Sequence, residues 1–156
     1  MHIARRLVSA LMLLLGTTTA QAFTLSQGDE HGTGQILTVK NESVEFRFVR
    51  AAGGYNDEFI WDLSSPDKSF LCHDVQRGDT FSLETYTDET VLDFFLRTPK
   101  GYLWVTGNGT YNPDGLAHAR LEQKDEHSVR LGFEDLAGGG DLDYDDCVVD
   151  LIITPR

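Results

Sequence analysis

Carboxylate side chains are concentrated in one short segment near the C-terminal end of the sequence. Residues 131–150 contain seven acidic side chains and neither lysine nor arginine. Two carboxylates about 4 Å apart repel each other by roughly 4 kcal/mol at an effective dielectric constant near 20. A compact loop therefore needs a cation, or screening by solvent, to bring several of them together. Carboxylate oxygens suit Ca²⁺, whereas zinc and copper favour histidine and cysteine, so the segment predicts a calcium site.

The spacing of these acids differs from that of two familiar calcium loops. Asp141, Asp143 and Asp145 follow the first half of an EF-hand loop. Asp146 then stands where that loop requires glycine, and Ile152 where it requires glutamate. The glycine–aspartate unit occurs once, which excludes a repetitive β-roll. The calcium prediction thus depends on carboxylate density and on three consecutive glycines at 138–140, which allow a tight backbone. A solvated acidic turn is the alternative.

A second group of polar residues precedes this segment. Asn112-Pro113-Asp114-Gly115 is a strong type I turn sequence. His118 follows three residues later and is either part of a site or a histidine satisfied within the fold. On its own, the group predicts a turn.

The two segments together resemble a known family. The pattern from Asn112 to His118, followed by Glu134-Asp135, the triple glycine and the run 141–146 (DLDYDD), is similar to the signature of domain of unknown function 4114. Residues 53–59 (GGYNDEF) are similar to the N-terminal part of that family. The family occurs in bacterial secreted proteins and in large RTX adhesins.

This resemblance implies an extracellular, β-rich, calcium-binding domain with no established catalytic activity. It also implies a set of metal ligands. Asp145 stands where the family often has asparagine, which keeps an oxygen ligand. The implied ligands are Asp141, Asp143, Asp146 and Asp145, with Glu134, Asp135 and Asp114 as secondary candidates.

Short segments of alternating apolar and polar residues must position these side chains. Alternation over 44–48, 92–97, 129–133 and 147–153, with turn residues between such segments, predicts seven or eight short strands. This pattern is typical of an all-β, antiparallel, jelly-roll-like β-sandwich with little helix, and a closed barrel is the alternative. Residues 114–123 predict either one helical turn or a strand. We expect a single domain over residues 23–156.

The N-terminus and the cysteines predict export. Residues 1–22 combine Arg5 and Arg6 with a short apolar run and end in Ala20-Gln21-Ala22, as in a signal peptide cleaved between Ala22 and Phe23. The mature protein would be extracellular or periplasmic. In such an oxidising compartment Cys72 and Cys147 are expected to form one disulfide.

Charge excludes some functions and leaves others open. Without residues 1–22 the net charge is −14, which argues against nucleic acid and against anionic membranes as partners. Membrane insertion of the mature chain is not expected. No nucleophile elbow, zinc-binding helix or phosphate-binding loop is present in the sequence, so we do not expect an enzyme.

The principal hypothesis is a calcium-binding module that recognises a surface or mediates adhesion. One alternative is a self-assembling filament or matrix subunit, in which residues 23–38 are donated to a neighbouring copy. Another is calcium-dependent recognition of a cell-surface glycan through Trp61, Trp104 or Tyr111, although these aromatic side chains are also expected in a core.

Overall fold

The structure is a computed structural model that describes residues 23–29 and 33–156. The predicted signal peptide, residues 1–22, lies outside the described residues. Phe23, the expected first residue of the mature chain, begins strand β1 and is buried.

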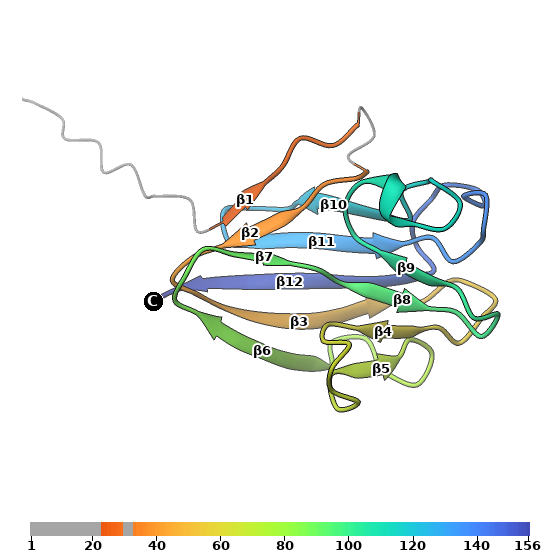
Figure 1. The fold of residues 1–156 in the computed structure, drawn as a ribbon. Helices are drawn as coiled ribbons and strands as arrows, with labels where there is room; N and C mark the ends of the chain where they lie inside the picture. Colours follow the sequence, from red (N-terminus) through yellow and green to blue (C-terminus); the bar gives the residue numbers. More distant parts are fainter. Residues whose placement is uncertain (1–22, 30–32) are drawn as a thin grey trace, which may run out of the picture.

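The largest sheet has five strands in the order β10-β11-β12-β3-β6, and all its neighbouring strands are antiparallel (Figure 1). Its two longest strands lie next to each other. The five strands are β3 (Glu42–Arg50), β6 (Thr80–Tyr86), β10 (Ala119–Gln123), β11 (Ser128–Phe133) and β12 (Cys147–Pro155).

Two smaller antiparallel sheets are built from three-residue strands. One has the order β1-β2-β7 and the other β5-β4-β8-β9. The seven strands are β1 (Phe23–Leu25), β2 (Leu37–Val39), β4 (Glu58–Ile60), β5 (Ser69–Leu71), β7 (Thr90–Leu92), β8 (Phe95–Arg97) and β9 (Leu103–Val105).

The five-stranded and four-stranded sheets pack face to face through aromatic side chains and form the two layers of the sandwich at this end. Phe46 of β3 contacts Phe59 of β4 and Phe94, with ring centroids 5.2 and 5.5 Å apart. Phe59 also contacts Phe133 at the end of β11, at 6.0 Å. Along β3, the apolar side chains of alternate residues are buried and the intervening polar residues are more exposed, as expected for a strand with one face in the core. The predicted antiparallel β-sandwich is confirmed.

Two local segments differ from a simple reading of the pattern. The alternating residues 92–97 do not form one strand: Leu92 ends β7, whereas 95–97 form β8 in a different sheet, and Asp93 and Phe94 lie between the two strands. Residues 119–123 form β10, so the strand alternative holds there, and the preceding turn contains only a short 3₁₀ helix, Gly109–Tyr111.

The N-terminal segment pairs within its own chain. Phe23 pairs with Val39, and Leu37 pairs with Leu92. Across residues 23–29 and 33–156, no helix is both long and apolar enough to cross a membrane.

Candidate metal centre

The acidic segment connects two neighbouring strands of the large sheet. Glu134 and Asp135 follow the end of β11, and Asp146 precedes the start of β12. The amide N–H of Asp146 donates to the carbonyl of Phe133 over 3.1 Å, so pairing continues beyond the strand ends. The antiparallel arrangement therefore places both ends of the connection side by side.

Three of the predicted ligands converge in the interior. Carboxylate oxygens of Glu134, Asp135 and Asp146 lie within 4.8 Å of one another. Glu134 is 1% exposed and Asp135 is 4% exposed. A second group with the same spacing joins Glu134 to Asp141 and Asp143, which are exposed. Glu134 thus belongs to both groups.

Asp57, which the sequence analysis did not single out, lies beside Asp135, a member of the first group. It lies just before β4 of the four-stranded sheet, which packs against the large sheet, and it is 0% exposed. No N–H or hydroxyl group of the described residues donates to either of its carboxylate oxygens or to Oδ2 of Asp135. The two carboxyl groups interact directly with each other. The sequence signal available for it was an acid directly before an aromatic strand, within the segment 53–59.

Burial makes ionisation of this group unfavourable. Burial, followed by the charges of Asp135 and Asp146, raises the pKa of Asp57 to about 7. Burial, then Asp146, raises the pKa of Glu134 to about 7. Burial also raises the pKa values of Asp135 and Asp146. A bound cation would reverse this effect, because it stabilises the ionised carboxylates.

Two glycines leave space for the carboxylates. A Cβ atom on Gly140 would collide with the carboxylate of Glu134. A Cβ atom on Gly53 would lie 2.5 Å from Oδ1 of Asp146 and 2.9 Å from Oδ2 of Asp135. The backbone therefore approaches the acids from two sides, and a larger residue at either position would displace a carboxylate.

Aromatic donors hold the backbone behind the carboxylates. Nε1 of Trp104 donates to the carbonyl of Asp135 over 2.9 Å. Nδ1 of His118, which is fully buried, lies 2.9 Å from the carbonyl of Glu134 and must donate to it. The Trp104 and His118 rings stack with centroids 3.6 Å apart and planes 3° apart. This stack fixes the backbone from which two of the acids project.

Asp114 is occupied by protein donors in this structure. Its Oδ2 accepts from the amide of Gly138 and faces Nε2 of His118, both at 2.9 Å. Its Oδ1 accepts from the amide of Leu116 at 3.0 Å. Partial burial raises the pKa of Asp114, but these hydrogen bonds outweigh it and lower the pKa to about 2. Asp114 therefore ties the turn at 112–115 to the triple glycine.

Asp145 points to a different partner. Its carboxylate pairs with Arg50 at 2.7 Å, and its carbonyl accepts from the amide of Ala52 at 3.1 Å. These contacts join the acidic segment to the chain that follows β3.

The predicted disulfide is present and lies beside the acids. Cys72 and Cys147 are bonded, both buried, with Cα atoms 5.9 Å apart. Cys147 follows Asp146 directly, and the amide of Cys72 donates to the carbonyl of Asp57 over 2.8 Å. The bond therefore links the chain segments that carry these two acids.

The residues present fit a hard cation. Every member of the two groups contributes a carboxylate, and the cysteines nearby are oxidised. Oδ2 of Asp135 is buried without a hydrogen-bond donor, and a cation held between the acids would satisfy it. The acids can thus hold a metal ion.

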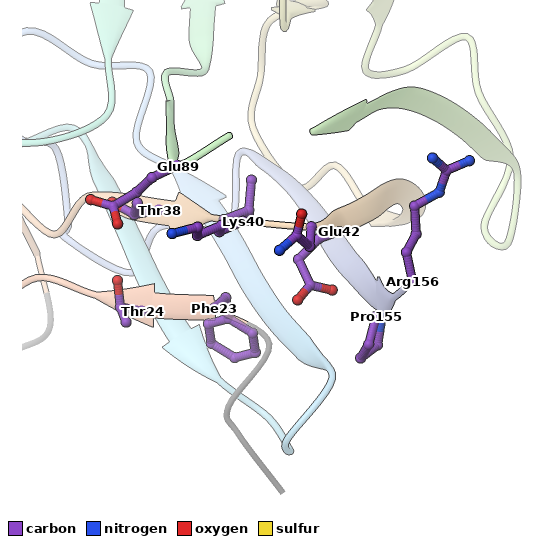
Figure 2. Close-up of a pocket in the computed structure, with 10 residues that line it drawn as sticks. Phe23, Thr24, Thr38, Lys40, Glu42, Glu89, Pro155 and Arg156 are labelled. Atoms are coloured by element: carbon purple, nitrogen blue, oxygen red, sulfur yellow. The ribbon is translucent and has the colours of Figure 1, made fainter. Parts of the chain in front are cut away.

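A large cavity lies away from these acids. It measures about 650 Å³ and is lined by residues at the start of β1 and β3 and at the end of β12 (Figure 2). Since β12 begins beside Asp146, the length of this strand separates the cavity from the acids. Lys40, Glu42, Glu89 and Arg156 give the cavity mixed charge.

The proposed glycan-binding aromatics are placed differently from one another. Trp104 is fully buried in the stack, and Trp61 packs against the core. Tyr111 is 61% exposed. Only Tyr111 of the three therefore presents a broadly accessible ring.

Comparison with known proteins gave one match. A family model described as "Domain of unknown function (DUF4114)" matches residues 75–154, just over half of the chain. The match includes the acidic segment, Asp114 and His118, and begins after residues 53–59. Neither curated proteins nor solved structures gave a significant match.

Proposed function

Because the chain belongs to the DUF4114 family, whose description assigns no function, we propose a function from the site itself: an exported β-sandwich that binds calcium through Glu134, Asp135 and Asp146 and acts as a binding or adhesion module. The convergence of these three carboxylates, two of them buried, with Oδ2 of Asp135 lacking a hydrogen-bond donor, carries this proposal. Such groups are costly in a fold unless they are protonated or bind a cation. A set composed entirely of carboxylates favours calcium over softer metals.

The same burial argues for binding rather than catalysis. Asp57 and Glu134 are at most 1% exposed, so a substrate cannot reach them without opening the fold. A bare ion needs far less space than a substrate. The exposed acids Asp141 and Asp143 offer oxygens along the outer side of the same loop.

Export is supported by the N-terminal pattern and by the disulfide. A buried Cys72–Cys147 bond suits an oxidising compartment. The proposed order of events is cleavage after Ala22, oxidation, and binding of calcium outside the cytoplasm. A surface partner would contact the exposed residues around the loop.

Thermal unfolding tests the metal proposal. At a calcium concentration about 100 times Kd, binding adds roughly 2.7 kcal/mol of stability, which corresponds to a rise in Tm of about 5–10 °C for a chain of this size. E134Q and D146N should abolish the rise. D88N, which removes a charge from the exposed β6–β7 turn, should retain it. Identical melting curves of the wild-type protein in calcium and in EGTA would refute the proposal.

A further inference from the structure

The connection between β3 and β4 encloses the acids from the opposite layer. It runs from Ala51 to Asp57 and includes the two glycines at 53 and 54. Gly53 places its backbone against the carboxylates of Asp135 and Asp146, where no larger residue fits without displacement. Asp57 then points a fully buried carboxylate, without a donor, at Asp135.

We propose that this connection is the second wall of the cation centre and that Asp57 supplies its fourth carboxylate, so that one bound ion joins the two layers of the sandwich. The inference rests on the proposed function and adds to it a ligand that lies outside both the acidic segment and the part of the chain matched by the family.

Contacts around Asp57 keep it in place. Its carbonyl accepts from Cys72, and the neighbouring Asn56 accepts from the amide of His73 over 2.9 Å through Oδ1. Nδ2 of Asn56 donates to Asp74 over 3.1 Å. At the other end of the connection, Ala52 donates to Asp145. The backbone is thus anchored at both ends, yet the carboxylate of Asp57 receives no donor.

This arrangement has a specific consequence for Asp57. A carboxylate that served only the fold would be expected to have donors, as Asp114 does. Asp57 instead faces the carboxyl group of Asp135, and two buried acids in contact destabilise the metal-free fold. With a cation bound, the same side chain contributes a hard oxygen ligand.

Substitution D57N separates these two roles. The amide keeps the size of the side chain, removes its charge and can donate to Asp135. We expect D57N to raise Tm in EGTA and, in the same protein, to weaken calcium binding at least tenfold by isothermal titration calorimetry with CaCl₂. A substitution that raises Tm in EGTA and weakens calcium binding identifies a ligand. Replacement of a purely structural residue would not weaken binding while stabilising the metal-free fold.

Gly53 provides a second test with a matched control. In G53A the new methyl group would displace the Asp146 and Asp135 carboxylates, whereas a Cβ atom on Gly54 meets nothing within 4 Å. We expect G53A to lose calcium affinity at least tenfold and G54A to bind like the wild type. This pair tests whether the connection forms a wall of the centre even if D57N does not fold, whereas D57N alone tests Asp57 as a ligand.

The outcomes are distinguishable from those for the proposed function. If D146N loses calcium binding while D57N and G53A bind calcium normally, the proposal for the β3–β4 connection is refuted and the proposed metal site is retained. If D57N lowers Tm in EGTA and leaves the affinity unchanged, Asp57 is structural and the inference is wrong. If the wild-type protein binds no calcium, both proposals fail.

Discussion

Gly138 and Gly140 have the same backbone preference but different surroundings. Both have positive φ, 83° and 50°, a region that side chains other than that of glycine adopt at a cost. A Cβ atom on Gly138 would meet nothing within 4 Å, whereas one on Gly140 would collide with Glu134. Alanine variants at these two positions therefore distinguish the effect of backbone strain from the effect of displacing Glu134.

We expect G140A to abolish the calcium-dependent rise in Tm, because Glu134 belongs to both groups of acids. G138A should lower Tm in EGTA by the general cost of a strained backbone, and should retain the rise in calcium. Differential scanning fluorimetry of both variants, with and without calcium, measures this difference. Equal calcium responses would show that Glu134 is not a ligand.

At the scale of elements, two layers meet at the acids and are joined there by a covalent bond. Cys72 follows β5 in the four-stranded sheet and Cys147 begins β12 in the five-stranded sheet. Asp57 contacts the first cysteine through its carbonyl, and Asp146 precedes the second. Separation of the layers would therefore separate the acids on which the proposed centre depends.

We expect the double variant C72A/C147A to lower the free energy of unfolding by about 4 kcal/mol, the loop-closure contribution of a sequence separation of 75 residues. Calcium affinity should also fall, since Asp57 and Asp146 lose their shared restraint. Urea unfolding in EGTA and calorimetric titration with CaCl₂ measure the two effects. A loss of stability with unchanged affinity would show that the disulfide does not position the acids.

The position of the N-terminal strands makes self-assembly by strand donation costly. Residues 23–38, proposed for donation to a neighbour, contribute β1 and part of β2 to the chain's own three-stranded sheet. Phe23 and Leu37 are both buried there. Donation to another copy would first have to remove these side chains from the core, which costs the hydrophobic stabilisation of both.

For the whole molecule, the buried acids make stability depend on pH in a direction that calcium should reverse. The pKa values of Asp57 and Glu134 are raised to about 7 from ordinary values of 3.8 and 4.5. A raised pKa in the fold means that the folded state binds the proton more tightly than the unfolded state. Its contribution to stability is present below the unfolded value and is lost as pH rises through about 7.

In EGTA, we therefore expect Tm to fall between about pH 4.5 and pH 8. Saturating calcium should remove this fall, because the ion favours the ionised carboxylates. Asp114, with its pKa lowered to about 2, loses its contribution only in more acidic solution and does not mask the effect. Thermal melts across this range, with and without calcium, provide the measurement. A Tm that rises steadily with pH in EGTA would contradict the expected protonation of the site.

Alternation of residue types was sufficient to identify the long strands. β3 and β12 have one face against the core, so burial imposes a period of two on their sequences. The division of residues 92–97 between two sheets was not visible, since alternation records which face is buried and not which strand is the neighbour. The cysteine pair followed from the count of two cysteines and from the predicted export.

The sequence by itself determined that acids cluster near the C-terminus, that the chain is all-β, and that Cys72 pairs with Cys147. Local patterns carry this information because strand burial and charge density are properties of neighbouring residues. Only the tertiary structure decided which acids meet: it buried Glu134 and Asp135, directed Asp114 and Asp145 to protein partners, and brought in Asp57. The physical reason is that two packed layers bring together side chains that are distant along the chain, and only packing decides which of them remain without a donor.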